Sequence, residues 1–503
     1  RQAAGDAEPN GEIPLTPVMH WARELSVDID RFHQLMFLDL PADVTADRLA
    51  VSLQRVVDEH DALRMRLIVR PDGDWRLLPR EPGVLAGAAI LRRVDVSALT
   101  SDQLAECERE QIHAATHRLD AQRGRMIEAI WFDAGSNRQG GLLLLVHHFA
   151  IDGVSWRVLI PALRSAYEGP LVKSGGRESS FGEWAKKLAA EAQTDTRARE
   201  TAFWVEALRK SEPLFADRPL SRTRDTVRSA AWLTVTLPPS TTGPLLRAVP
   251  AAYQGNITDI LLTGLAIALL EWRRTHRRDS AHAVTIDLER HGRDHSFSGI
   301  DVTQTIGWFT TMFPVRIDLR GIDLTNAWTG GGALDKAVKT VKEQMRRIPD
   351  NGIGFGLLRY LNKATAPILA ALNSPQIAFN YFGRLQAHGV PDWTLAARRQ
   401  AFGGGFDPDT PLAHHLDVNA LTIDGPDGPR LRVHWTWPSA IITETEVRPL
   451  AEGWFHILSR LARLAEAAGH GGRTPSDVPF VSLTQAEIDR LEQAVIRGRG
   501  PQG

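Results

Sequence analysis

The stretch Val146-His147-His148-Phe149-Ala150-Ile151-Asp152-Gly153-Val154-Ser155-Trp156 carries most of the information about the fold of this chain. It continues an apolar run, residues 142–145, that predicts a buried strand, and its Asp-Gly pair predicts a turn. Because successive side chains of a strand point to opposite faces, only one of the two histidines can face a given cavity. An imidazole at the end of a buried strand is well placed to act as a general base. We therefore expect one histidine to face a site and the other to pack behind it.

Composition and charge exclude several classes of protein. The chain has 503 residues, enough for two or more lobes with sizeable cores. A net charge of −1 leaves no basic surface typical of nucleic-acid binding. The single cysteine, Cys107, excludes an internal disulfide and a thiolate metal site, and it fits a reducing cytoplasm. Because no apolar stretch reaches the length of a membrane span, we expect a cytoplasmic protein that binds no metal, nucleic acid or membrane.

Hydrophobic patterning predicts helices and strands mixed in two successive halves, which indicates α/β lobes. A helix is expected to run into a strand over 46–66, and Asn256 is expected to cap a later helix. Other helices are expected near 181–209 and over 444–468, and strands around 230–237, 284–288, 312–319, 376–382, 415–422 and 431–437. A Gly/Ser-rich break at 168–180 suggests the boundary between lobes. The predicted organisation is a linker at 1–12, an N-terminal lobe at 13–175, a C-terminal lobe at 176–480 and a C-terminal linker at 481–503.

Two further polar segments lie at the ends of predicted strands. The segment 287–294, Asp-Leu-Glu-Arg-His-Gly-Arg-Asp, follows the apolar residues 283–286. Taken alone it is typical of a solvated loop, and it lacks the His-Glu-x-x-His pattern of zinc proteases. The segment 379–383, Phe-Asn-Tyr-Phe-Gly, places an amide and a phenol at another strand end. The neighbouring pair His414 and His415 has no Asp-Gly after it, and we interpret both as ordinary strand residues.

In order along the chain, these segments resemble the signature motifs of epimerization domains of nonribosomal peptide synthetases. Such domains belong to the chloramphenicol-acetyltransferase-like superfamily that carries the HHxxxDG motif. The resemblance covers roughly residues 12–492. The motifs that carry it are Pro14-Leu15-Thr16-Pro17 with His20-Trp21, and residues 147–156, 289–293, 304–314, 349–356 and 379–383. It implies an α/β fold in which two acetyltransferase-like lobes form a V with a tunnel between them.

The resemblance also implies a reaction and a partner. The substrate would be an aminoacyl or peptidyl thioester on the 4'-phosphopantetheine arm of a peptidyl carrier protein upstream in the same synthetase, and the domain would hold no permanent cofactor. Removal and return of the α-proton would interconvert L and D forms. Inversion needs proton donors or acceptors on both faces of the carbanion, which points to His148 and Glu289 as the catalytic pair. Asn380 and Tyr381 could bind the enolate or the substrate, and Arg293 could position Glu289 or the pantetheine.

The remaining motif residues are implied to be structural. Asp152 is expected to pair with an arginine and so hold the histidine loop, with Arg64 and Arg293 as candidates. Three more residues complete the expected structural set: His147, Gly153 and Trp156.

Two other functions remain open. A condensation domain shares the histidine motif and joins two carrier-bound substrates through an amide bond, although the motifs at 289–293 and 304–314 favour epimerization. A non-catalytic docking module that recruits tailoring enzymes has a related fold, although the intact histidine motif argues against it. In each case the neighbouring domains of the synthetase would be partners.

Overall fold

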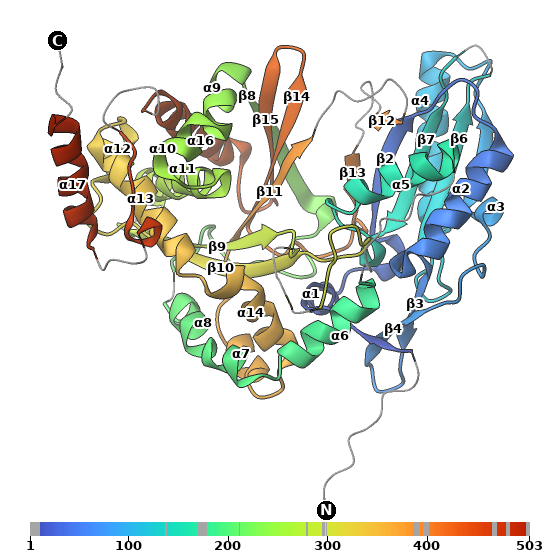
Figure 1. Cartoon of the computed structure of the whole chain (residues 1–503), viewed down its shortest axis with the longest axis horizontal. Coiled ribbons are helices and arrows are strands. Elements are labelled where there is room, and N and C mark those ends of the chain that lie inside the picture. Colours follow the sequence, from blue (N-terminus) through green and yellow to red (C-terminus); the bar gives the residue numbers. More distant parts are fainter. Residues whose placement is uncertain are drawn as a thin grey trace, which may run out of the picture.

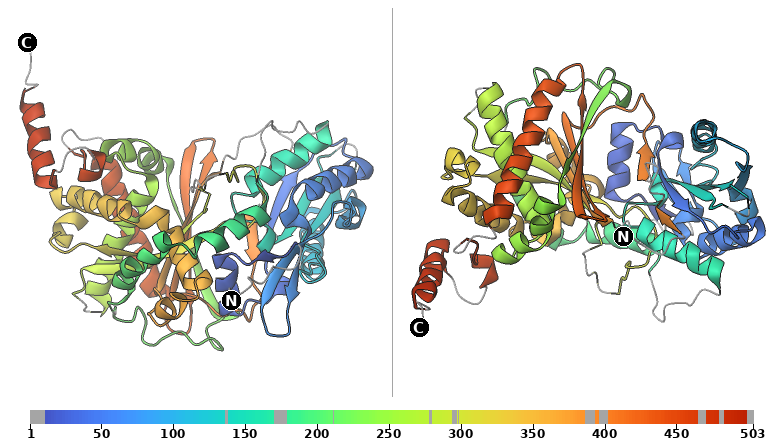
Figure 2. Two further views of the ribbon diagram at one scale, coloured as in Figure 1. Left: turned by 60° about the horizontal axis from the view of Figure 1, so that its bottom comes forward. Right: turned by 90° about the horizontal axis from the view of Figure 1, so that it is seen from above.

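The computed structural model describes residues 11–135, 138–169, 179–210, 212–277, 280–293, 297, 299–385, 393–395, 402–464, 470–478 and 483–498. Figure 1 shows two lobes side by side, each built on a sheet with helices packed against it. In the left view of Figure 2 the two lobes diverge from a common base, consistent with the predicted V. Most of the predicted linker at 1–12 and of the break at 168–180 lies outside the described residues.

The N-terminal lobe is built around the strand that leads into the histidine motif. Its main sheet has the order β12-β2-β7-β6-β5, with β13 also paired to β2. The strands are β2 (His33–Asp39), β5 (Leu91–Asp95), β6 (Ile127–Asp133), β7 (Gly141–His147), β12 (Thr394–Leu395) and β13 (Phe402–Gly405). The helices are α2 (Ala46–Glu59), α3 (Gly87–Ile90), α4 (Ser101–Thr116) and α5 (Trp156–Glu168).

Both faces of β7 are buried because helices cover both sides of this sheet. Leu142, Leu144 and Val146 belong to the core on the α2 side, whereas Leu143 and Leu145 belong to the core on the α4 side. A strand buried on both faces is uniformly apolar rather than alternating, which explains the run that precedes the histidines. A smaller sheet of β1 (Ile13–Pro14), β4 (Trp75–Pro79) and β3 (Met65–Val69) extends from this lobe beside α1 (Pro17–Leu25).

The C-terminal lobe contains a six-stranded mixed sheet of order β10-β9-β11-β14-β15-β8. The strands are β8 (Ala230–Leu237), β9 (Ala283–Arg290), β10 (Thr311–Asp318), β11 (Ile377–Leu385), β14 (Leu416–Gly425) and β15 (Gly428–Pro438). Strand β11 runs parallel to both β9 and β14. Because the ends of parallel strands meet at one edge, this topology gathers the polar residues of three chain segments.

The helices of the C-terminal lobe bury one face of its sheet. The central helix, α11 (Ile257–Trp272), is apolar all round and begins at Asn256, whose side chain accepts a hydrogen bond from the Asp259 N–H. It packs against α13 (Gly332–Arg346) and α16 (Glu444–Leu464). The other helices of this half of the chain are α6 (Phe181–Glu191), α7 (Asp195–Arg199), α8 (Thr201–Leu208), α9 (Pro239–Leu246), α10 (Ala248–Tyr253), α12 (Leu324–Trp328), α14 (Ile353–Gly356), α15 (Ala366–Ala370) and α17 (Gln485–Gly498).

The structure departs from the predicted division into lobes in three places. Strands β12 and β13, from the second half of the chain, pair with β2 and so complete the sheet of the first half; an edge strand has backbone groups that need such partners. Helix α6 packs its buried aromatic side chains into the N-terminal core. The predicted C-terminal linker contains α17, a helix whose Asp489 carboxylate lies 3.0 Å from the Lys339 ammonium of α13.

The segment 349–356, which its glycines predict to be a loop, is instead a 3₁₀ turn followed by α14. No single helix in the described part of the chain has the length and apolarity to cross a membrane. One sharply bent helix pair, Pro239–Tyr253 with Ile257–Arg277, meets those criteria by length and composition only.

Candidate active site

His148 lies where the two lobes meet. Strand β7 ends at His147, and His148 starts a 3₁₀ turn. Its ring stacks on Phe32, with centroids 4.5 Å apart, and lies against Trp308 from the second half of the chain, also at 4.5 Å. Loss of solvation beside these rings lowers the pKa of His148 to about 4. The imidazole is therefore neutral at pH 7 and able to accept a proton.

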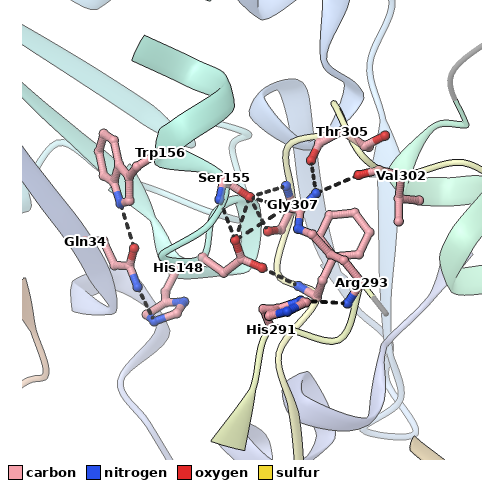
Figure 3. A network of polar contacts seen from close by, with 11 residues as sticks. Gln34, His148, Ser155, Trp156, His291, Arg293, Val302, Thr305 and Gly307 are labelled. Carbon is pink, nitrogen blue, oxygen red and sulfur yellow. Dashed lines mark hydrogen bonds and ion pairs between the residues drawn. The ribbon is translucent and has the colours of Figure 1, made fainter. Parts of the chain in front are cut away.

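The hydrogen bonds of His148 come from a residue that the sequence did not suggest. The Gln34 side-chain nitrogen lies 2.9 Å from His148 Nε2, and the Trp156 indole N–H donates to Gln34 Oε1 at 2.8 Å (Figure 3). The other ring nitrogen of His148, Nδ1, is buried, and the ring also lies against the backbone of His148 and Ile151. Trp156 and Gln34 are buried, whereas His148 is only partly buried.

His147 points into the N-terminal lobe, opposite to His148. Its Nε2 donates to the Ile29 carbonyl oxygen at 2.7 Å, and its Nδ1 accepts from the Phe149 N–H at 3.1 Å. Burial lowers the pKa of His147 to about 4. Both ring nitrogens are satisfied by backbone groups, and the orientation agrees with the one expected from strand alternation.

Asp152 joins the histidine loop to a loop of the other lobe. Its Oδ1 accepts from the Ser155 N–H at 2.7 Å, and its Oδ2 accepts from the Phe309 N–H at 3.0 Å. Arg293 approaches Oδ1 at 3.4 Å. The arginine partner is thus Arg293 and not Arg64, whose guanidinium donates to the Arg80 carbonyl oxygen. Gly153 follows, and a Cβ at this position would lie 3.4 Å from the Phe382 ring.

The Arg293 guanidinium is enclosed by three loops (Figure 3). Its Nη1 donates to the carbonyl oxygens of Val302 and Thr305, each at 2.7 Å, and its Nη2 donates to Ser155 Oγ at 2.8 Å. Its charged end also lies 4.0 Å from the centre of the Phe309 ring. These contacts make Arg293 a clamp between the lobes, because its Nη1 and Nη2 donors face protein oxygens rather than open space. They offer no support for the expected contact with substrate.

Gly292 explains how this clamp reaches so close to its partner loop. Its φ is +66°, and a Cβ at this position would lie 1.8 Å from the Phe309 carbonyl oxygen. Only glycine fits both the left-handed conformation and the close approach. The next residue's N–H donates to His291 Nδ1 at 3.2 Å, which further fixes the turn.

Glu289 lies on the face of the C-terminal sheet that is opposite to the helices. It pairs in register with Asn380 of β11, and the Asn380 side-chain N–H donates to Glu289 Oε2 at 2.8 Å. Burial, followed by the nearby Asp417 carboxylate, raises the pKa of Glu289 to about 7. Tyr381 points to the other face, where its hydroxyl lies 2.9 Å from Thr422 Oγ1 and its ring packs on the lobe's core. The structure therefore joins Asn380 to Glu289 and separates Tyr381 from both.

His414 belongs to the same charged face, although the sequence indicated an ordinary strand residue. Its Nε2 lies 2.9 Å from Asp287 Oδ2, and its Nδ1 lies 3.0 Å from Asp417 Oδ1. Burial opposes the charged form, but these two carboxylates outweigh it and raise the pKa of His414 to about 10. The result is a buried imidazolium between two carboxylates, close to Glu289. His415 is different, because its Nε2 donates to the Arg218 carbonyl oxygen.

A cavity of about 220 Å³ lies between the lobes. Its wall includes Trp21 of α1, Trp308, which also packs on His148, and Asp287 with His414. His148 and Glu289 are themselves absent from this wall as the described residues define it. The expectation that both residues face one shared tunnel therefore remains a prediction. On the cavity wall, Trp308 packs on His148, and Met312 pairs in register with Glu289.

Comparison with known proteins places this site in a family. Residues 10–411 match the family model described as a condensation domain. The chain belongs to the condensation-domain family. Two relatives are a linear gramicidin synthase from Brevibacillus parabrevis, 31% identical over 95% of this chain, and chondramide synthase from Chondromyces crocatus, 32% identical over 96%. This condensation-family domain spans only 6% and 12% of the length of these two synthases.

Two solved structures align with most of this chain. The epimerization domain from the third module of tyrocidine synthetase B aligns with a TM-score of 0.76 and 28% identity, over 92% of this chain and 99% of that domain. The first condensation domain of the calcium-dependent antibiotic synthetase aligns with a TM-score of 0.62 and 19% identity, over 92% and 98%. The second likeness supports the shared fold of two lobes.

Proposed function

We propose that this domain is an epimerization domain, which inverts the α-carbon of an aminoacyl or peptidyl thioester. The thioester is carried on the phosphopantetheine arm of a carrier protein that lies upstream in the same synthetase, in the cytoplasm. The motifs at 289–293 and 379–383 and the similarity to a solved epimerization domain support this proposal.

The single observation that carries the proposal is the partly buried Glu289 carboxyl held by Asn380. The pKa values of the two candidate catalytic groups are shifted in opposite directions, to about 4 for His148 and to about 7 for Glu289. At neutral pH one group is thus an unprotonated base and the other keeps a proton for much of the time. Such a pair is what acid–base chemistry on two sides of a carbon needs.

The reaction follows from these protonation states. Neutral His148 takes the α-proton, and the electron pair of the C–H bond moves into the enolate of the thioester. Protonated Glu289 returns a proton to the opposite face, which leaves an imidazolium and a carboxylate. The reverse reaction, from D to L, starts from the His148 imidazolium and the Glu289 carboxylate. It ends with neutral His148 and protonated Glu289. Asn380 holds the Glu289 carboxyl in place throughout.

Condensation is the second candidate, because the matching family model describes condensation domains and the histidine motif is common to both reactions. A condensation reaction needs a base near the attacking amine but no second acid at the α-carbon. Removal of the Glu289 carboxyl therefore separates the two functions.

The test is incubation of the domain with a loaded carrier protein in D₂O, read by mass spectrometry and by chiral analysis of the released amino acid. We expect deuterium at the α-carbon and a mixture of L and D forms. Glu289→Gln should reduce both by about 10²–10⁴-fold, whereas Glu206→Gln, on the exposed side of α8, should not. Amide formation with a second carrier and no deuterium uptake would establish condensation instead, and neither product would favour a docking module.

A further inference from the structure

We propose that Gln34 is a positioning residue that fixes the tautomer of His148, so that the basic lone pair lies on Nε2. Trp156 fixes the orientation of the Gln34 amide by donating a hydrogen bond to its oxygen. The role in catalysis rests on the proposed function, whereas the tautomer can be measured whatever the domain does.

The argument starts from the donor and acceptor capacity of each group. An indole N–H can only donate, so the Gln34 atom that faces Trp156 at 2.8 Å must be the amide oxygen. The amide nitrogen then faces His148 Nε2 at 2.9 Å. Because an amide NH₂ also can only donate, His148 Nε2 must accept. The ring proton of neutral His148 consequently lies on Nδ1.

The backbone holds these groups in a rigid frame. Gln34 lies on β2 opposite Val146 of β7, and β13 covers its other edge. The His148 N–H donates to the Phe32 carbonyl oxygen at 2.9 Å, so the histidine is tied to the residues beside Gln34. The Gln34 side chain is itself buried, with a residue exposure of 7%. Reversal of the amide would place two donors face to face at Trp156, with no water to relieve them.

This arrangement gives the base a defined behaviour. In the resting state a hydrogen bond to Nε2 keeps the imidazole neutral. A proton taken up at Nε2 would face the Gln34 NH₂ group, so the imidazolium is disfavoured and returns its proton readily. A reaction that moves a proton back and forth needs such a base. The other titratable groups around His148 are His33 on β2, His147 and Asp152, and Asp152 is paired with Arg293.

Two substitutions separate the hydrogen bond from packing. Gln34→Glu places an acceptor carboxylate against both Trp156 and His148, which stabilises a protonated Nε2. Gln34→Met keeps the length of the side chain and removes both hydrogen bonds. Gln344→Met is the matched control, because this amide binds backbone groups of Asp318 in the other lobe. Thermal melts of all three variants test whether each remains folded.

The first measurement is ¹⁵N NMR of protein labelled at histidine, with the His148 signals identified by their loss in His148→Gln. We expect the wild type and Gln344→Met to carry the proton on Nδ1. In Gln34→Met, His148 should show a mixture of tautomers. In Gln34→Glu, the His148 imidazole should stay protonated to a pH about 1–3 units higher than in the wild type. A wild-type proton on Nε2, or no change in either Gln34 variant, would overturn the inference.

The second measurement is the pH dependence of deuterium uptake by the loaded carrier. The acid limb reports protonation of the base, so Gln34→Glu should move that limb to higher pH, while Gln34→Met should lower kcat about tenfold or more with KM within twofold. If the wild type takes up no deuterium, the proposed function fails and the NMR result still decides the tautomer. If it does, and both Gln34 variants keep the wild-type pH profile, Gln34 has no positioning role.

Discussion

At the scale of single residues, the surroundings of His148 and Asp152 differ in a way that fits a catalytic role for His148 and a structural role for Asp152. The His148 ring contacts two aromatic rings and one side-chain amide, so its replacement removes few stabilising interactions. Asp152 is almost fully buried and receives hydrogen bonds from two backbone N–H groups, of Ser155 and Phe309, besides its contact with Arg293. Its carboxylate compensates a buried guanidinium that cannot lose its charge.

We therefore expect Asp152→Ala to lower the free energy of unfolding by roughly 3–5 kcal/mol, because it leaves the Arg293 charge buried without its carboxylate partner. His148→Ala should remain well folded and inactive. Chemical denaturation of both variants measures the difference, which an activity assay alone would miss. A stable but inactive Asp152→Ala protein would instead place Asp152 among the catalytic groups.

Glu289 gives a second prediction at this scale, from proton linkage. The folded protein holds the pKa of Glu289 at about 7, above the ordinary value of 4.5. Between these values the folded state binds more protons than the unfolded state, so this group makes the protein less stable as pH rises. Glu289→Gln lacks the effect, so its stability relative to wild type should increase from pH 4.5 to pH 7 and then level off. Urea denaturation at pH 5, 6 and 8 tests this, and a difference that is independent of pH would contradict it.

At the scale of elements, three strands assemble the charged face of the C-terminal sheet. Strand β9 contributes Asp287 and Glu289 from alternate positions, β11 contributes Asn380, and β14 contributes Asp417. His414 lies just before β14 and places one charge between two carboxylates. Without this cation, the charge of the buried Asp287 carboxylate beside Asp417 would be strongly disfavoured.

His414→Gln should therefore destabilise the protein in a pH-dependent way. Because the pKa of His414 is raised to about 10 in the folded state, its stabilising contribution is complete below the ordinary value of 6.5 and is lost as pH rises toward 10. The stability difference between wild type and variant should be largest near pH 6 and small near pH 9.5, as measured by denaturation at both values.

His415→Gln is the matched control for this prediction. The His415 ring is bound to a carbonyl oxygen rather than to carboxylates, and burial lowers its pKa. Unlike His414→Gln, His415→Gln should not show a loss of stability that is large at pH 6 and small at pH 9.5. Equal pH profiles for the two variants would show that the carboxylate pair does not hold an imidazolium.

At the scale of the whole molecule, the two lobes share structure that a simple division of the chain would separate. The N-terminal core includes Phe297, Trp308 and Phe309 from the second half of the chain. Strands β12 and β13 complete the N-terminal sheet. Further ion pairs, of Arg31 with Asp407 at 2.6 Å and of Arg359 with Glu24 at 2.7 Å, link the halves. In Figure 1, α17 lies at the outer end of the C-terminal lobe, far from this interface.

We expect a fragment of residues 13–175 to be unable to fold alone, since its core would lose these aromatic side chains and its edge strand β2 would lose its partners. Circular dichroism melts of the fragment should lack a cooperative transition, whereas the full chain should unfold with its two halves coupled. A fragment that melts cooperatively near the temperature of the full chain would show that the lobes are independent.

Local patterns in the sequence determined much of this protein. The apolar run before His147 predicts a buried strand, Asn256 predicts the start of α11, and the Asp152-Gly153 pair predicts a turn, because each depends on residues a few positions apart. The order of motifs indicated the fold of two lobes and the pair His148 and Glu289.

The tertiary structure alone decided which distant residues meet. It selected Arg293 rather than Arg64 for Asp152, placed His414 between Asp287 and Asp417, and brought Gln34 and Trp156 together on His148. It also paired β13, from the second half of the chain, with β2 of the first half. These contacts join segments from different parts of the chain, and they depend on strand order and on crossovers between the lobes. The periodicity of one segment does not tell which other segment will lie beside it.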